Sequence, residues 1–244
     1  MDSLGEDMET HDYKKYASNY AELGITNSYY LAFKDIPFLL EKYTDKNMKF
    51  LDYGCGAGRS LRFIKSLGYS NIVGVDISED MLKQAKLQDK EGTYSLIKDS
   101  KIPYEDNTFD VIFMSYVFLE VGEYNEIVKI LNEFKRVLKD NGQIIFITSI
   151  VKNIKDEWLS FSYDFKENEK NLSVCQNLKL LIKDNNIILY DYNWLPKDYE
   201  RAIKESNLNL VEVHIPMGND NDPYNWLSEK TVPYNYIYVL KKNI

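Results

Sequence analysis

Apolar residues follow two different periods along the middle of the chain. The short apolar runs predict five buried β-strands, near residues 48–52, 71–76, 94–97, 110–114 and 143–149. Apolar residues at helical spacing predict the helices between these strands, over roughly 58–67, 79–87 and 124–138. Strands that alternate with helices indicate an α/β fold with a parallel sheet and helices on both faces. A last helix after Pro196 and two more apolar runs, 210–215 and 234–240, complete a seven-stranded, mostly parallel sheet.

The segments outside this alternation predict a cap and an insertion. Tyr13, Tyr16 and Tyr20 share one face of a predicted helix, and residues 28–43 predict a second helix that Pro37 kinks or divides. Two β-rich runs around a polar turn predict a β-hairpin inserted after the fifth strand. We therefore expect a single domain over residues 1–244, with an N-terminal helical cap (1–47), a core (48–150), a β insertion that covers the substrate (151–195), and a last helix with the terminal strands (196–244).

A glycine turn carries the first chemical signal. The first strand ends in Asp52, and Gly54, Gly56 and Gly58 follow at alternate positions. The second strand ends in Asp76, 18 residues after Gly58. A glycine turn beside an acidic strand end suits a nucleoside with a free ribose, because the turn allows close approach and the carboxylate can accept both ribose hydroxyls.

The spacing separates two classes of nucleoside cofactor. A dinucleotide fingerprint is G-x-G-x-x-G, whereas here the third glycine comes one residue early and Arg59 takes its place. Asp99-Ser100, Ile102-Pro103 and the run from Tyr104 to Ile112 then follow in order. Together with D-x-G-x-G-x-G, this stretch of about residues 48–150 resembles the class I, Rossmann-like S-adenosylmethionine-dependent methyltransferases of the small-molecule type. The alternatives are a Rossmann-like domain whose glycines only form a tight turn, and a nicotinamide enzyme.

The resemblance implies S-adenosyl-L-methionine as the cofactor, bound at the carboxyl ends of the strands. Asp76 would take the ribose hydroxyls, and Asp99 the adenine amino group. The other residues to which the resemblance or their position assigns a cofactor role are Tyr20, Asp52, Gly54, Cys55, Gly56, Ile77, Met81, Ser100, Ser115 and Tyr116. Plain core packing is the alternative for Ile77 and Met81, turn capping is the alternative for Asp99, and Asp52 is expected to brace the turn.

The acceptor side is defined less sharply, because the resemblance is weakest in the segments that would form it. Candidate substrate-binding residues are Tyr16, Tyr30, Glu120, Trp158, Tyr192 and Trp194. The alternative for Tyr16 is packing on the apolar face of its helix, and the alternative for Tyr192 and Trp194 is anchoring of the insertion. Tyr116 and His214 are the candidate catalytic residues, and a structural role is the alternative for His214. No histidine occurs in the stretch from Ser115 to Glu120, so we assign no general base.

The composition of the chain limits the kinds of partner that we expect the protein to bind. The chain has 38 acidic and 30 basic residues, a net charge of −8, which disfavours nucleic acid because such binding requires basic side chains at the phosphates. Two cysteines, Cys55 and Cys175, are too few for a disulfide scaffold, and no motif predicts a metal site. No apolar run approaches the roughly 20 residues that span a bilayer, and residues 1–12 do not resemble a signal peptide, so we expect a cytoplasmic protein without a membrane partner.

The expected activity is transfer of a methyl group to an oxygen or nitrogen atom of a small-molecule acceptor by in-line displacement. The alternatives are a methyltransferase that acts on a macromolecule, either a protein side chain or tRNA, and a non-catalytic domain that binds S-adenosylmethionine. The sequence leaves open the acceptor, the methylated atom and the oligomeric state.

Overall fold

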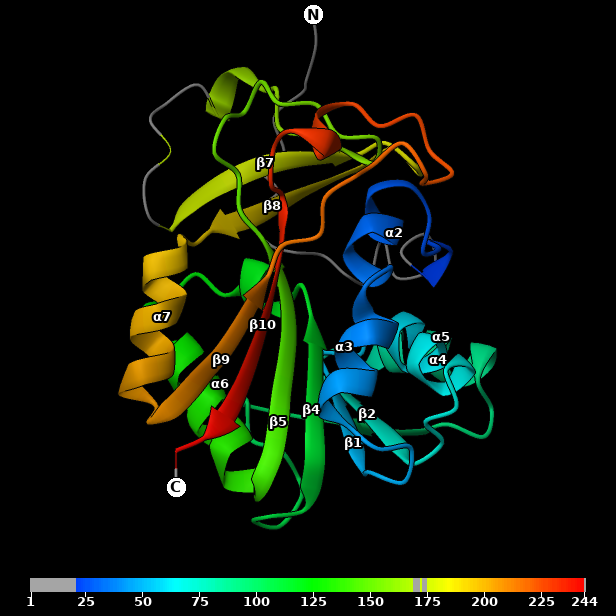
Figure 1. Ribbon diagram of the computed structural model, residues 1–244, viewed down its shortest axis with the longest axis vertical. Helices are drawn as coiled ribbons and strands as arrows, with labels where there is room; N and C mark the ends of the chain where they lie inside the picture. The colour runs from blue at the N-terminus through cyan, green and yellow to red at the C-terminus, as the bar shows by residue number, and fades with distance from the viewer. Residues whose placement is uncertain (1–20, 169–171, 173–174, 244) are drawn as a thin grey trace, which may run out of the picture.

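A seven-stranded sheet forms the centre of the molecule (Figure 1). The computed structural model describes residues 21–168, 172 and 175–243. The strand order is β3-β2-β1-β4-β5-β10-β9; β1 to β5 are parallel and β10 runs antiparallel to both of its neighbours. The predicted seven-stranded, mostly parallel sheet is confirmed. Its strands are β1 (Phe50–Tyr53), β2 (Ile72–Asp76), β3 (Thr93–Leu96), β4 (Phe109–Ser115), β5 (Leu138–Ser149), β9 (Leu208–His214) and β10 (Asn235–Lys242).

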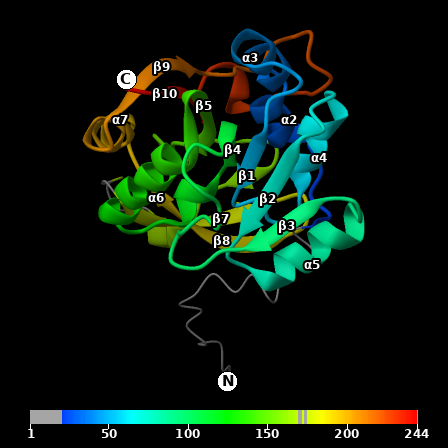
Figure 2. The same ribbon diagram turned by 90° about the horizontal axis from the view of Figure 1, so that it is seen from below.

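Helices cover both faces of this sheet, as predicted. Figure 2 looks along the strands and shows α6 and α7 on one side of the sheet and α3 and α4 on the other. One hydrophobic core contains Ile127 of α6 and Tyr199 of α7. A second core, on the other face, contains Leu39 of α3 and Leu61 of α4. Burial of these apolar faces against the sheet is the main force that holds the layers together. The helices are α3 (Ile36–Tyr43), α4 (Arg59–Ser66), α5 (Glu79–Gln88), α6 (Tyr124–Val137) and α7 (Pro196–Glu205).

The N-terminal cap contains a divided helix. The sequence predicts one helix over residues 28–43 that Pro37 kinks or divides, and the structure has α2 (Asn27–Phe33) followed by α3. Pro37 lies in the first turn of α3, where its missing N–H costs no helical hydrogen bond. The predicted helix that carries Tyr13, Tyr16 and Tyr20 falls on residues 13–20, outside the described residues.

The fifth strand begins earlier than predicted. β5 starts at Leu138 rather than at residue 143, directly after α6. Its pairing with β4 jumps from Phe109↔Leu138 to Val111↔Gln143, so residues 139–142 bulge out of the ladder. The bulge interrupts the apolar pattern, which is why the sequence indicates only the second part of the strand.

The insertion forms a small antiparallel sheet with its own core. The predicted hairpin is confirmed as β7 (Gln176–Ile182) and β8 (Ile187–Asn193), and a short third strand, β6 (Phe161–Ser162), pairs with β7. This core contains Leu178 of β7 together with Trp158, Tyr163 and Tyr234. Figure 1 shows β7 and β8 beyond the upper ends of β4 and β5, which are their carboxyl ends. The small sheet therefore faces the edge at which ligands of parallel sheets bind.

None of the helices within the described ranges has the length and apolarity that crossing a bilayer requires. A cytoplasmic location stays a prediction from the sequence.

Candidate functional site

The glycine turn lies between β1 and α4. Gly54 and Gly56 have φ angles of +66° and +52°, in the left-handed region that favours glycine. A Cβ atom at Gly54 would lie 2.2 Å from Val117 Cγ2, so this glycine allows the turn to pack against the segment after β4. At Gly56 a Cβ atom would meet no described atom within 4 Å. Gly56 therefore borders open space, and it lines a cavity at this edge of the sheet.

Asp52 links the strand before the glycine turn to the helix after it. Its side chain is completely buried, and the Ser60 hydroxyl at the start of α4 donates to Oδ2 at 2.6 Å. Burial raises the pKa of Asp52 to about 7, partly offset by the hydrogen bond from Ser60. Asp52 does not line the cavity, so the structure supports a bracing role rather than ligand contact.

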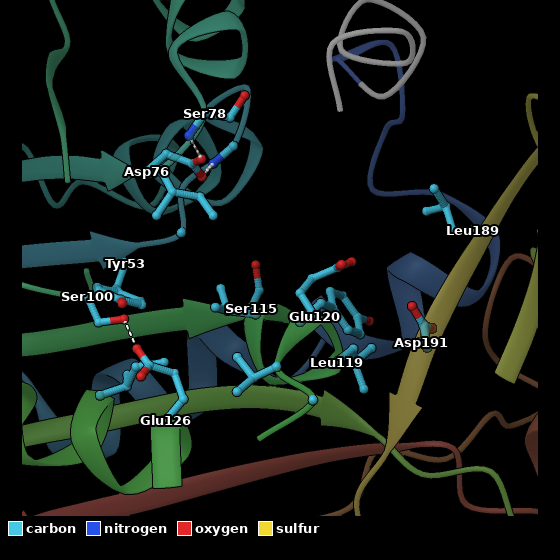
Figure 3. Close-up of a pocket in the computed structure, with 18 of the residues that line it drawn as sticks. Tyr53, Asp76, Ser78, Ser100, Ser115, Leu119, Glu120, Glu126, Leu189 and Asp191 are labelled. Atoms are coloured by element: carbon cyan, nitrogen blue, oxygen red, sulfur yellow. Dashed lines mark hydrogen bonds between the residues drawn. The ribbon is translucent and has the colours of Figure 1, made fainter. Parts of the chain in front are cut away.

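Asp76 joins the end of β2 to the glycine turn. Its Oδ2 accepts a hydrogen bond from the Gly56 N–H at 2.7 Å, and its Oδ1 accepts one from the Ser78 N–H at 2.8 Å (Figure 3). The side chain is 8% exposed and lines the cavity. Burial raises the pKa of Asp76, and the two N–H groups oppose that shift. The carboxylate is thus fixed in place at the cavity wall before any ligand arrives.

Four other predicted cofactor residues line the same cavity. Ile77, 68% exposed, and the buried Met81 both line the cavity. Asp99 and Ser100 form a tight turn with φ angles of +49° and +60°, and the Ser100 hydroxyl donates to Glu126 Oε1 on α6. Ile77, Asp99 and Ser100 follow the ends of β2 and β3, and Met81 lies in the first turn of α5, the helix that follows β2.

The segment after β4 forms the middle of the cavity. Ser115 ends the strand, Tyr116 follows with a φ angle of +65°, and the 3₁₀ helix η1 (Val117–Glu120) carries Glu120 to the cavity wall. Figure 3 shows Ser115 and Glu120 between Asp76 at one end of the cavity and Asp191 at the other. The Tyr116 hydroxyl donates to Asn235 Oδ1 at 3.0 Å, while Tyr116 lines the cavity.

The far wall is apolar and comes mostly from the small sheet. Leu180 and Leu189 face each other across the β7–β8 ladder, and Phe161 of β6 lies beside them at the cavity. These residues were not predicted from the sequence. The other lining residues that were not predicted are Tyr29, Tyr53, Ser78, Ile97, Val117, Leu119, Val121, Gly122, Glu123, Asn125, Glu126, Lys129, Ile130, Ile182, Asp191 and Tyr234. A signal for the β8 residues was present in the chain: alternate residues of β8 are buried, and that row contains Leu189 and Asp191.

Four predicted residues pack behind the cavity wall rather than in it. Trp158 has no exposed surface, because its ring packs on Tyr234 with the centroids 4.7 Å apart. The Trp194 indole N–H donates to the Val121 carbonyl at 2.7 Å, and a Cβ at Gly122 would touch the Tyr192 ring. Cys55 is buried, and its Sγ would lie 2.7 Å from a Cβ atom at Gly74. The structure therefore places Cys55, Trp158, Tyr192 and Trp194 as supports of the wall.

Two more predicted residues lie elsewhere, and two are not described. The Tyr30 ring packs on Tyr224, with the centroids 5.2 Å apart, and does not line the cavity. His214 lies on the edge strand β9, where its Nε2 and Asp35 Oδ2 are 2.8 Å apart. Tyr16 and Tyr20 fall outside the described residues. The assignment of His214 as a catalytic candidate is corrected, because its ring is held by Asp35 away from the cavity.

We expect His214→Gln to leave both cofactor affinity and methyl transfer within twofold of wild type. The imidazole and Asp35 are both partly exposed, so their pairing contributes at most about 1 kcal/mol to the free energy of unfolding. Calorimetric titration of S-adenosylhomocysteine and initial rates of methyl transfer measure the outcome. A tenfold loss in either quantity would restore His214 as a site residue.

The cavity has a volume of about 780 Å³, within the range of about 300–1,000 Å³ that is usual for small-molecule sites. Across the part of the chain that the structure describes, no group of three His, Cys, Asp or Glu side chains is arranged to hold a metal ion.

Comparisons with known proteins agree with this geometry. Residues 51–146 match a family model described as a methyltransferase domain. An uncharacterized protein of Methanocaldococcus jannaschii is 32% identical over 158 residues, which are 64% of this chain and 64% of that protein. The demethylmenaquinone methyltransferase of Bacillus subtilis is 31% identical over 121 residues, 43% of this chain and 51% of the relative. The chain thus spans between half and two thirds of the length of these curated relatives.

The likeness extends to solved structures. A crystal structure described as an S-adenosylmethionine-dependent methyltransferase from Clostridium acetobutylicum superposes with a TM-score of 0.61 and 15% identity, covering 95% of this chain and 99% of that one. At this level of identity, the structural likeness shows a shared fold.

Proposed function

We propose that this protein, whose residues 51–146 match a methyltransferase-domain model, is a class I, S-adenosylmethionine-dependent methyltransferase that transfers a methyl group to an oxygen or nitrogen atom of a small-molecule acceptor. The observation that supports the proposal most directly is the position of Asp76. Its carboxylate stands at the cavity wall, fixed by the Gly56 and Ser78 N–H groups, where a cofactor ribose would lie. The turn and the carboxylate are tied together by the chain itself, so the nucleoside end of the site is preformed.

The residues around Asp76 fit S-adenosylmethionine. Gly56 borders open space, so a ligand can approach its backbone closely. In this proposal Asp76 accepts the ribose hydroxyls, and Ile77 and Met81 pack against the adenine. Asp99 accepts from the adenine amino group, and Ser100 adds a backbone contact. The methionine end of the cofactor then lies toward Ser115 and Tyr116.

S-adenosylmethionine supplies an activated methyl group on its sulfonium. The chain must hold an acceptor in line with that group and exclude water. Positioning of this kind lowers the barrier because reactants that are already aligned lose less freedom of motion at the transition state. The apolar wall formed by Phe161, Leu180 and Leu189 supports both tasks: it excludes water and presents a surface for the acceptor.

A small acceptor fits the cavity better than a macromolecule does. The three-stranded sheet lies beyond the carboxyl ends of the main strands and supplies one wall of the cavity. The net charge of −8 opposes tRNA. The name of the Bacillus subtilis relative, a demethylmenaquinone methyltransferase, also suggests a small acceptor.

The test uses two measurements on the purified chain. We expect S-adenosylhomocysteine to bind with micromolar affinity by calorimetry, and tritiated methyl groups to pass from S-adenosylmethionine into a small-molecule fraction of a cell extract. Heat-denatured protein is the control. Tritium that appears in tRNA or protein instead would indicate a macromolecular acceptor. Binding of S-adenosylhomocysteine without any methyl transfer would favour a non-catalytic domain.

A further inference from the structure

The wall that the small sheet contributes to the cavity is apolar except for one carboxylate. Phe161, Leu180 and Leu189 line it, and Asp191 on β8 lies among them. The β7–β8 register pairs Leu180 with Leu189 and Leu178 with Asp191. Asp191 therefore belongs to the inward row of the strand, although a carboxylate at such a position is costly to bury unless it has partners.

Asp191 is held in place by buried tyrosines. The Tyr163 hydroxyl donates to Asp191 Oδ2 at 2.9 Å, and the Tyr234 hydroxyl lies 3.0 Å from that of Tyr163. Because Tyr163 gives its only proton to the carboxylate, Tyr234 must donate to Tyr163. Burial raises the pKa of Tyr163 well above its usual value, so this hydroxyl remains a donor. The carboxylate is thus oriented at the cavity wall by a chain of two buried tyrosine hydroxyls.

The charges along the cavity favour a cation over an anion. Six carboxylates line it within the described residues, against one basic side chain, Lys129. The Lys129 Nζ atom lies 3.3 Å from Glu126 Oε2, so this basic group already has an acidic partner. The six acids are Asp76, Asp99, Glu120, Glu123, Glu126 and Asp191. An acceptor with a carboxylate or phosphate group would meet like charges here without a basic partner, whereas an ammonium group would meet opposite charges.

We propose that the methyl acceptor is an apolar amine whose ammonium group is held by Asp191 while its body packs on Phe161, Leu180 and Leu189. The inference rests on the proposed methyltransferase function and names the acceptor class of that site. Asp191 takes the proton that the nitrogen must lose and passes it to solvent. The nitrogen lone pair then forms the new N–C bond as the C–S bond breaks, and the electron pair of that bond leaves on sulfur.

Matched probes test the preference on the wild-type chain. With S-adenosylhomocysteine at saturation, calorimetry compares 4-phenylbutylamine, 4-phenylbutanol and 4-phenylbutyrate, which differ mainly in the head group. We expect the amine to bind at least tenfold more tightly than the carboxylate, with the alcohol between them. Equal affinities, or no detectable binding of the amine, would overturn the inference.

A pair of variants tests the residue. Asp191→Asn keeps an oxygen that can accept from Tyr163, so we expect a folded protein with at least tenfold weaker amine binding and unchanged affinity for the alcohol. Asp164→Asn removes the same charge at an exposed site paired with Lys155 and should bind the amine as wild type does. Unchanged amine affinity in Asp191→Asn would refute the assignment, as would an equal loss in the Asp164 control.

The affinity for S-adenosylhomocysteine separates this inference from the function on which it rests. It should stay within twofold of wild type in Asp191→Asn, and a large loss would place Asp191 in the cofactor site instead. Failure of the wild-type chain to bind S-adenosylhomocysteine would defeat the methyltransferase proposal. Normal cofactor binding without an amine preference would defeat only the acceptor class.

Discussion

Replacing Asp76 with alanine should weaken the binding of S-adenosylhomocysteine about a hundredfold. In the proposed complex this carboxylate accepts two hydrogen bonds from the ribose hydroxyls. Each bond to a charged acceptor contributes about 1.5–3 kcal/mol, so the loss of both costs about 3 kcal/mol at the lower limit, or roughly two factors of ten in affinity. Isothermal titration calorimetry of wild type and variant measures the change directly.

The same carboxylate also stabilises the protein without a ligand, and the controls must separate the two roles. Asp76→Ala leaves the Gly56 and Ser78 N–H groups without their acceptor, so thermal unfolding should be measured in parallel. Asp76→Asn keeps the size and one acceptor oxygen and should lose less affinity than the alanine variant. Asp80→Ala removes a charge from the exposed side of α5, where Asp80 pairs with Lys83, and should bind as wild type does. Wild-type affinity in a folded Asp76→Ala variant would end the ribose assignment.

Asp76 belongs to the part of the site that the sequence predicts well. Gly54, Gly56, Asp76, Asp99 and Ser115 all lie at or just after a strand end, and in a parallel sheet such ends meet at one edge. Recognising the strands therefore brings these residues together without any knowledge of long-range packing. The structure places all five at the cavity.

The acceptor wall could not be predicted in the same way, because it depends on how the insertion packs on the rest of the chain. Trp158 and Phe161 are three residues apart and equally apolar, yet Trp158 packs behind Tyr234 and Phe161 lines the cavity. Tyr29 and Tyr30 likewise point to different neighbours, Tyr116 and Tyr224. Composition does not tell such neighbours apart. Asp191 could have been predicted, because it belongs to the alternate residues of β8 that point inward together with Leu189.

The packing of Gly54 on Val117 was also beyond local inference, and it leads to a second large expected effect. Gly54→Ala should lower the free energy of unfolding by about 2–5 kcal/mol and reduce cofactor affinity at least tenfold. A residue with a side chain at a left-handed φ costs about 1–2 kcal/mol, and overpacking a filled site costs about 1–3 kcal/mol more. The clash falls on Val117, which begins η1, so the displacement should reach Glu120 at the cavity.

Gly56→Ala separates strain from ligand contact. Gly56 also has a left-handed φ, but a Cβ atom added there would meet no described atom within 4 Å. The free energy of unfolding should therefore fall by only about 1–2 kcal/mol. If the cofactor lies against this backbone, the new methyl group occupies its space, and affinity should still fall at least tenfold. Gly68→Ala is the control for strain: its φ is +92°, its nearest contact is Lys46 Cδ at 3.9 Å, and it lies at the opposite end of β2 from the cavity.

Chemical denaturation and calorimetry on the three variants give a pattern that only one arrangement of the ligand produces. Gly68→Ala should lose stability alone, Gly56→Ala should lose a similar amount of stability and also affinity, and Gly54→Ala should lose more stability together with affinity. Adding Val117→Ala to Gly54→Ala removes the clash but leaves the strained φ, so part of the stability should return. Wild-type affinity in Gly56→Ala would mean that the ligand passes elsewhere. The open space at this glycine would then be a feature of the turn alone, and the cofactor would have to be held chiefly through Asp76.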